Sequence, residues 1–284
     1  TLVSKEARKD VTVALSADGG DEVFGGYNRY DYMYRYGKTL NLIPNAIGKF
    51  LAGAMNNIPS EKIPILKNKY NFHNRYERLK TFLKNSNKKE IMLNLSQQFN
   101  VEQMKSVMKS EFKSLPTMFQ SKEMLENFKS PLSYMMAIDF QTYMLDDILQ
   151  KVDRATMSNS LEAREPMLDH RILEFTAQLP DEYKYQNGLK KRILREITHD
   201  YIPKELLDRP KMGFAIPIAK WLKNELRDHV EEYLNEDRIE KQGIFNWEFI
   251  TKLKMDFYKG RKEYDSKLWY FLMFQMWYER WMEN

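Results

Sequence analysis

The stretch VTVALSADGGDEVFGGYNRY, residues 11–30, decides the fold of this chain. It opens with residues 11–15, a short run rich in β-branched side chains that ends at a glycine loop, which is typical of a buried parallel strand. The loop after such a strand lies at the carboxyl edge of its sheet, where open α/β folds bind ligands. The stretch therefore predicts an α/β fold with a ligand site directly after this strand.

The loop that follows the strand carries three carboxylates among its glycines: Asp18, Asp21 and Glu22. Gly19 and Gly20 allow backbone amides to approach an anion closely, and Ser16 offers a hydroxyl donor. The carboxylates would repel a bare phosphate, but Mg²⁺ can lie between carboxylate and phosphate oxygens. We interpret the loop as a nucleotide and magnesium site. The alternative is an acidic, solvated turn before a helix N-terminus, where negative charge is favourable.

A second candidate is the segment RPKMGFAIP, residues 209–217. It shows no helical pattern, and Lys211 stands between Pro210 and Gly213, so its ammonium could be held at a fixed point. A positioned lysine stabilises charge that develops on phosphoryl oxygens. On these residues alone, an ordinary exposed loop lysine is the simpler interpretation.

A long helix is predicted over residues 130–163, where Ser130 and Pro131 suit its start and apolar residues recur at helical spacing. The third candidate is LDDILQKVDRATMSNSLEAREPMLDHR, residues 145–171, which begins inside this helix. Asp146 and Asp153 are seven residues apart and share a face of that helix. Asp147 and Lys151 are predicted to form an i, i+4 ion pair. Arg154, Glu162 and Arg164 add further charge to the same segment. Both a structural ion-pair network and the wall of a pocket fit this density of charge.

Composition narrows the class of protein. With 284 residues and 43% hydrophobic residues, the chain can bury a sizeable core. Its net charge of +5 mixes both signs along the sequence and shows no clustered basic helix, so we expect no nucleic-acid partner. The absence of cysteine excludes disulfides, thiolate metal sites and a cysteine nucleophile. The four histidines, His73, His170, His199 and His229, have no metal-ligand spacing.

No segment predicts a membrane span or a secretory signal. The most apolar tract, residues 268–278, is too short to cross a bilayer and indicates a buried aromatic helix. We therefore expect a cytoplasmic protein. Beyond residues 11–15 almost nothing alternates with period two, and the rest is predicted to be helical. A lone parallel strand lacks partners, so the chain is predicted to be a fragment of a doubly wound parallel-sheet fold, mostly α-helical in the portion present.

Four ordered segments resemble the synthetase domain of glutamine-hydrolysing asparagine synthetases: LSADGGDEVFGGYNRY, MLDDILQKVDRATMSNSLEAREPMLDHRILEF, LKKRILREITHDYIPKEL and RPKMGFAIPIAKWL. The resemblance covers residues 2–30 and about 130–225. It implies an ATP-pyrophosphatase fold. In that family the side-chain carboxylate of aspartate attacks ATP to give β-aspartyl-AMP and pyrophosphate, and ammonia then displaces AMP.

Carried over by position, the resemblance assigns roles to single residues. Ser16 is similar to the nucleotide-binding serine at the strand end, and Asp21 to the ligand of magnesium and pyrophosphate. Lys211 is similar to the lysine that stabilises the adenylation transition state. Asp18 stands where an acidic residue is thought to help ammonia attack. ATP, aspartate and Mg²⁺ are the implied substrates and cofactor.

Two family features are missing from these residues. One is the S-G-G-x-D-S pyrophosphate loop, and the other is the N-terminal glutaminase domain with its catalytic cysteine. Residues 1–284 are therefore expected to be the C-terminal portion of one synthetase domain, with ammonia supplied by a glutaminase domain of the parent chain. A homodimer is compatible with the sequence. The alternatives are a related amidotransferase acting on another carboxylate in antibiotic or cell-surface polymer synthesis, and an inactive helical interaction module.

Overall fold

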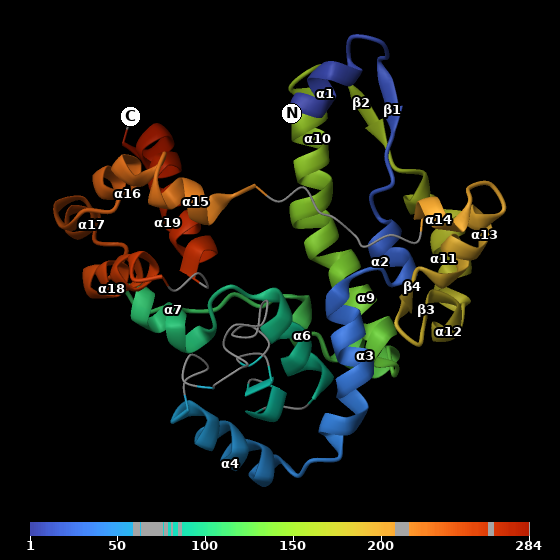
Figure 1. The fold of residues 1–284 in the computed structure, drawn as a ribbon, viewed down its shortest axis with the longest axis horizontal. Helices are drawn as coiled ribbons and strands as arrows, with labels where there is room; N and C mark the ends of the chain where they lie inside the picture. The colour runs from blue at the N-terminus through green and yellow to red at the C-terminus, as the bar shows by residue number, and fades with distance from the viewer. Residues whose placement is uncertain are drawn as a thin grey trace. The chain divides into compact units, whose positions relative to one another are not determined.

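A computed structural model describes residues 1–58, 63, 76, 79–80, 82–84, 87–207, 216–260 and 264–283 of the chain. Helices predominate in this part, with few and short strands (Figure 1). The chain divides into two compact units. Unit 1 comprises Thr1–Asn57, Leu79–Leu95 and Pro116–Pro210, and unit 2 comprises Ile58–Arg78, Ser96–Leu115 and Lys211–Asn284.

Most elements belong to unit 1. In chain order they are α1 (Leu2–Ala7), β1 (Val13–Leu15), α2 (Gly20–Phe24), α3 (Asn28–Asn41), α4 (Asn45–Asn56), α6 (Lys88–Ser96), η2 (Met118–Gln120), α8 (Lys122–Asn127), α9 (Pro131–Gln141), η3 (Met144–Leu149), α10 (Gln150–Met157), β2 (Glu162–Arg164), η4 (Pro166–Leu168), α11 (His170–Gln178), α12 (Asp181–Lys184), β3 (Tyr185–Gln186), β4 (Leu189–Lys190), α13 (Arg192–His199) and α14 (Lys204–Leu207).

The expected strand has a partner within this chain. β1 pairs in parallel with β2, with Val13 opposite Glu162 and Leu15 opposite Arg164. The expectations of a lone strand and of a helix reaching residue 163 were therefore wrong. The helix stops at Met157 because a turn follows in which Ser160 adopts a left-handed φ of 57°, and this turn sends the chain back alongside β1.

The predicted long helix begins as expected but is not regular. The Ser130 hydroxyl accepts hydrogen bonds from the amides of Leu132 and Ser133 at 3.1 and 3.3 Å, and Pro131 follows in the first turn. After α9 the chain forms the π-helical segment η3 before α10 continues (Figure 1). Such wide turns are rare and often lie beside functional sites.

A small hairpin follows α12, where only helix was expected. β3 and β4 are antiparallel, with Tyr185 opposite Lys190. The two turn residues, Asn187 and Gly188, have φ of 51° and 89°, the left-handed pair that a tight two-residue hairpin turn requires. The Asn-Gly dipeptide is the local signal for this hairpin.

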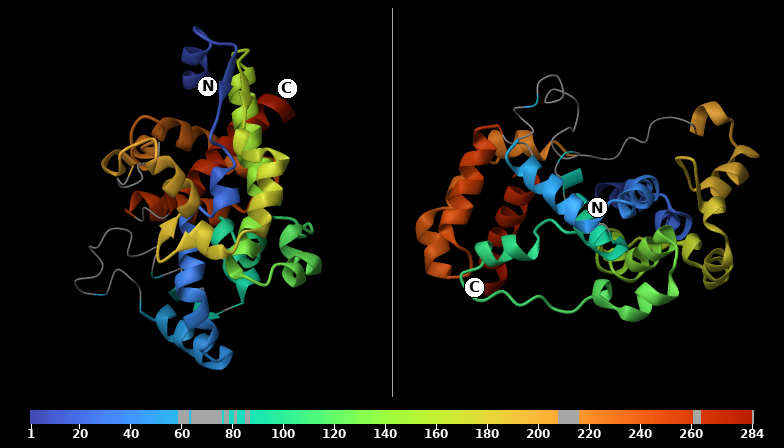
Figure 2. Two further views of the ribbon diagram at one scale, coloured as in Figure 1. Left: turned by 90° about the vertical axis from the view of Figure 1, so that its right-hand side faces the viewer. Right: turned by 90° about the horizontal axis from the view of Figure 1, so that it is seen from below.

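The core of unit 1 lies between α3 and α9, which run beside each other (Figure 2). Tyr30 and Met33 of α3 are buried, as are the α9 residues Tyr134, Met135 and Ile138. At about 25 cal/mol per Å² of apolar surface, each such side chain contributes roughly 1.5–3 kcal/mol. This packing fixes the start of α3, and so the end of the glycine loop that leads into it.

Unit 2 contains α7 (Val101–Val107), α15 (Ile218–Lys223), α16 (Arg227–Tyr233), α17 (Glu236–Gln242), α18 (Trp247–Tyr258) and α19 (Asp265–Met282). The predicted buried aromatic helix is confirmed in α19, where Leu268, Phe271 and Leu272 lie in the core. None of the helices among the described residues is long and apolar enough to cross a membrane.

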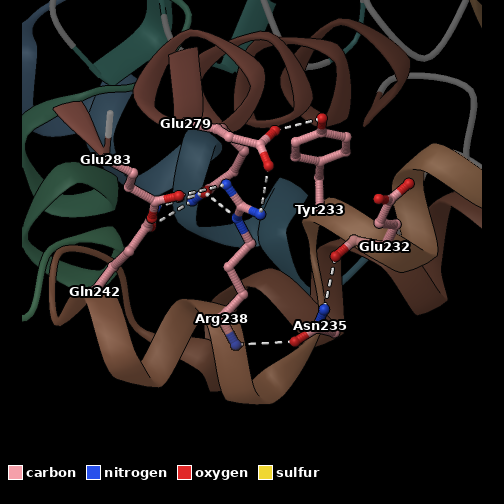
Figure 3. A network of polar contacts seen from close by, with 8 residues as sticks. Glu232, Tyr233, Asn235, Arg238, Gln242, Glu279 and Glu283 are labelled. Carbon is pink, nitrogen blue, oxygen red and sulfur yellow. Dashed lines mark hydrogen bonds and ion pairs between the residues drawn. The ribbon is translucent and has the colours of Figure 1, made fainter. Parts of the chain in front are cut away.

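A polar network joins α17 to α19 in unit 2 (Figure 3). Gln275, which is fully buried, exchanges amide hydrogen bonds with Gln242 at 2.7 and 2.8 Å. The Arg238 guanidinium donates to the Gln275 side-chain oxygen at 3.3 Å and forms ion pairs with Glu279 and Glu283. These contacts hold α17 and α19 together.

Candidate functional site

The loop after β1 gathers two of the predicted site residues. The Ser16 amide donates to the Arg164 carbonyl at 2.8 Å, which extends the β1–β2 ladder by one step. The Ser16 hydroxyl donates to the Asp18 carboxylate, and the Asp18 amide points back at the Ser16 oxygen at 3.3 Å. Ser16 and Asp18 therefore lie together at the carboxyl edge of the parallel pair, where the sequence placed them.

Gly19 is required by the shape of this loop. Its φ is +84°, a left-handed conformation that side chains disfavour, and a Cβ there would lie 2.2 Å from the Leu168 Cδ2 atom. Gly20 follows as the first residue of α2. The two glycines thus permit a tight turn into α2 against η4.

Asp21 forms an ion pair that the sequence did not predict. The Lys191 Nζ atom lies 2.8 Å from its Oδ1 atom, and the two side chains are 33% and 21% exposed. Gly26 makes room for this pair, because a Cβ on Gly26 would lie 1.8 Å from Asp21 Oδ1 and 2.3 Å from Lys191 Cε. The site therefore contains the Lys191 ammonium, which comes from a segment far from Asp21 in the sequence.

Lys191 carries a signal that could have found it. It stands directly before α13 in the run LKKR, and positive charge at a helix N-terminus is unfavourable. A basic N-terminus after an Asn-Gly turn therefore indicates that these cations have partners elsewhere. The partners are Asn28 for Lys190 and Asp21 for Lys191.

Glu165 is a further carboxylate near the loop that the sequence reasoning did not single out. Burial raises the pKa of Glu165, and the negative charges of Asp18 and Asp153 raise it further, against a backbone hydrogen bond that lowers it. The negative charges of Asp153 and Asp18 therefore both act on the Glu165 carboxyl group. Among the described residues, no group of three or more His, Cys, Asp or Glu side chains is arranged to hold a metal ion.

The third carboxylate of the loop, Glu22, is buried and faces inward. The Tyr27 hydroxyl donates to its carboxylate at 2.5 Å. Burial raises the pKa of Tyr27, and the hydrogen bond to Glu22 raises it further, so the phenol remains a protonated donor at neutral pH. Glu22 therefore belongs to the support beneath the loop, whereas Asp18 and Asp21 are partly exposed.

The charges on η3 and α10 do not form the expected regular face. Asp146 and Asp147 are exposed on the π-helical segment, whose wider turn breaks the seven-residue spacing between Asp146 and Asp153. In the described part of the chain Asp147 and Lys151 make no ion pair. Glu162 and Arg164 pair with each other at 2.6 Å on the surface. Lys211 lies outside the described residues.

The donor atoms present suit a magnesium ion shared with a phosphate ligand. Mg²⁺ in nucleotide sites takes one or two carboxylates and completes its shell with phosphate and water oxygens. Asp21 offers one partly exposed carboxylate beside Gly20, and Asp18 a second on the same loop. A site built from protein ligands alone would need more oxygen donors than the loop provides.

Comparison with known proteins points to one family. A family model described as asparagine synthase matches residues 1–279. Asparagine synthetase [glutamine-hydrolyzing] 1 of Bacillus subtilis is 31% identical over 280 residues, which cover 98% of this chain and 42% of the relative. A putative asparagine synthetase of Mycobacterium tuberculosis is 25% identical over all of this chain and 41% of its own length. The human asparagine synthetase is 41% identical over 93 residues, covering 32% of this chain and 16% of the relative.

The fold and the site define a helical α/β protein with a glycine loop at the end of a parallel strand. The chain belongs to the asparagine synthase family. It spans less than half the length of the Bacillus and Mycobacterium relatives. No solved structure gave a significant match.

Proposed function

We propose that this chain is part of a ligase that uses ATP to amidate aspartate, giving asparagine through a β-aspartyl-AMP intermediate. One observation carries the proposal. Ser16 and Asp18 are in contact on the glycine loop at the carboxyl edge of a parallel strand pair, and Asp21 follows at the start of α2, in a chain whose family is asparagine synthase. Strand ends of this kind are where α/β folds bind nucleotides.

The loop residues divide the chemistry among them. The Ser16 hydroxyl and the backbone at Gly19 and Gly20 would bind the nucleotide. Asp21 would hold Mg²⁺, which when bound neutralises charge on the phosphate oxygens. A carboxylate oxygen of aspartate then attacks the α-phosphorus, and pyrophosphate leaves.

The second half of the reaction needs ammonia. Its nitrogen attacks the activated β-carbonyl carbon, AMP leaves, and Asp18 takes part by accepting a proton from that nitrogen. Lys211 is proposed to stabilise the charge that develops during adenylation. The ammonia would come from glutamine hydrolysed by a glutaminase domain elsewhere in the protein, as the name glutamine-hydrolysing asparagine synthetase indicates for the relatives.

The domain organisation is proposed on the same grounds. Residues 1–284 would form the C-terminal portion of one synthetase domain, and β1 and β2 would be two strands of a doubly wound parallel sheet. The exposed side chain of Leu15 on β1, 74% accessible, supports a neighbour on that face of the sheet. The zero cysteine content is consistent with a cytoplasmic enzyme.

Pyrophosphate release tests the proposal. The protein would be assayed with ATP, Mg²⁺ and ammonia, with aspartate compared against glutamate, β-alanine and no acceptor. We expect release that depends on aspartate and falls at least about 100-fold in Asp21→Asn and Lys211→Ala, as expected when a group that stabilises the transition state is removed. Asp228→Asn and Lys252→Ala, which change exposed residues of unit 2, serve as matched controls.

Each other outcome has a definite meaning. Release that depends on a different acid would replace aspartate with that acceptor and favour a related amidotransferase. No release with any acid, from a protein that folds normally, would favour an inactive interaction module and contradict the proposal.

A further inference from the structure

Lys191 has an unusual backbone. It adopts φ 52° and ψ 40°, the left-handed region, although it is not glycine, and it stands immediately before α13. A residue held in this region costs of order 1 kcal/mol and persists only where surrounding contacts impose it. The lysine side chain gains nothing from the helix that follows, because a cation is unfavourable at a helix N-terminus. Its position is therefore imposed by tertiary contacts.

The hairpin before Lys191 is fastened to the start of α3. The Lys190 ammonium donates to the Asn28 side chain, and the Tyr185 hydroxyl donates to the Asp31 carboxylate. Arg192, on the other side of Lys191, donates to the Gln186 side chain at 2.8 Å. Both neighbours of Lys191 are thus anchored, which aims its side chain back at the glycine loop.

The ammonium of Lys191 lies close both to the proposed metal ligand Asp21 and to Gly20, whose backbone is proposed to bind the nucleotide. It is 2.8 Å from Asp21 Oδ1 and 3.8 Å from the position that a Cβ on Gly20 would take. Gly26 leaves the space that the pair occupies. A metal ion on Asp21 Oδ1 would face this ammonium at short range, where two cations repel each other strongly. The ion pair and a metal-bound Asp21 are therefore alternatives.

We propose that Lys191 is a positioning residue that occupies the Asp21 carboxylate while the site is free of metal, and that moves to the phosphate oxygens when a metal–nucleotide complex binds. This inference rests on the proposed function, because it assumes that Asp21 holds the metal. The four-carbon stem of lysine allows the ammonium to change partner while the anchored backbone stays in place. Lys191 would thus exclude free divalent cations and favour those that arrive with a polyphosphate.

The test uses two binding measurements that do not need turnover. Mn²⁺ alone is titrated by electron paramagnetic resonance, and the Mg²⁺ complex of a non-hydrolysable ATP analogue is titrated by calorimetry. In Lys191→Met we expect Mn²⁺ to bind about fivefold more tightly and the analogue about fivefold more weakly, the size of effect of a partly exposed ion pair. Asp21→Asn should abolish the gain in Mn²⁺ affinity.

Two lysine variants control the result. Lys204→Met removes an exposed ammonium of α14, elsewhere in unit 1, and should change neither affinity. Lys191→Arg keeps the charge and should restore analogue binding while Mn²⁺ affinity stays low. Circular dichroism would verify that all variants are folded.

The outcomes separate this inference from the proposed function. Unchanged or weaker Mn²⁺ binding in Lys191→Met, or analogue binding equal to the unsubstituted protein, would overturn the role of Lys191 even in an active enzyme. Opposite shifts of the two affinities in a protein that never releases pyrophosphate would support the role of Lys191 and contradict amidation.

Discussion

Arg29 and Asp139 form a two-point ion pair between α3 and α9. The Arg29 Nε atom donates to Asp139 Oδ2 at 2.9 Å, and the second contact, from Nη2 to Oδ1, is 2.8 Å. The Asp139 side chain is 1% exposed, and the Tyr30 hydroxyl also donates to it at 2.5 Å. The guanidinium lies over the rings of Tyr27 and Tyr143 at 4.3 and 4.7 Å. The chain that leaves the glycine loop is thereby fixed to the core.

Removing Arg29 should be costly. Arg29→Ala leaves the buried Asp139 carboxylate without its counter-ion, which typically costs about 3–5 kcal/mol. Urea unfolding monitored by circular dichroism would measure the loss. Arg171→Ala is the matched control, since Arg171 pairs with Asp169 on the surface and should change the free energy of unfolding little. Equal losses of unfolding free energy in the two variants would show that the burial of Asp139 does not make its ion pair with Arg29 more important than a surface pair.

Asp139 should also make stability depend on pH. Burial raises the pKa of Asp139 from 3.8 to about 6, although Arg29 and Tyr30 oppose the rise. As pH increases, the unfolded chain therefore releases this proton first, so the contribution of Asp139 to stability is greatest below pH 4 and is lost by about pH 6. A two-unit shift corresponds to about 3 kcal/mol.

The pH effect is read as a difference between two proteins. The free energy of unfolding is measured from pH 4 to 7 for the unsubstituted chain and for Asp139→Asn, which cannot titrate at this position. We expect the unsubstituted chain to lose stability relative to Asp139→Asn as pH rises. A difference that is constant across this range would mean that the pKa of Asp139 is the same in the folded and unfolded chains.

Gly26 should resist substitution. A Cβ at this position would overlap Asp21 Oδ1 and Lys191 Cε, so Gly26→Ala should separate the ion pair and cost about 1–3 kcal/mol of stability. Gly53→Ala in α4 is the matched control. A Cβ on Gly53 meets nothing within 4 Å, and alanine is favoured inside a helix by about 0.5–1 kcal/mol. Thermal unfolding should thus move in opposite directions for the two variants.

The amide pair in unit 2 offers a separate prediction. Gln275→Leu removes both hydrogen bonds to Gln242 and the acceptor of Arg238, while Gln275 itself is fully buried. We expect a loss of about 1–3 kcal/mol in the free energy of unfolding, the range for unpaired buried polar groups. Met276→Leu changes the next residue of α19 and should have little effect. A stabilised Gln275→Leu protein would mean that apolar packing outweighs the network.

The parts that could be predicted from sequence are those with a local signal. The strand at β1 and the glycine loop follow from adjacent residues, and the Ser130–Pro131 start of α9 follows from capping. The aromatic helix α19 follows from its apolar content. In each case the residues that decide the structure are neighbours in the chain.

The parts that were missed depend on distant residues. β2 has the sequence Glu-Ala-Arg, which has no β-strand preference, and it is a strand only because β1 lies beside it. Lys191 meets Asp21 only through the fold of unit 1, so no spacing rule connects them. The π-helical turn of η3 similarly has no pattern that distinguishes it from an ordinary helix. Lys211, which the resemblance makes important, stays a prediction.

The separation of β1 and β2 in the sequence also determines how long β1 must remain without β2 during synthesis. Val13 pairs with Glu162, so all elements from α2 to α10 must be synthesised before β1 can pair with β2. At about 5–20 residues per second, that delay is on the order of ten seconds. Throughout it, the edge of β1 that pairs with β2 presents unpaired backbone groups to any neighbouring nascent chain. Yield on expression should therefore depend on chaperones and on slow synthesis, and less on the final stability of the fold.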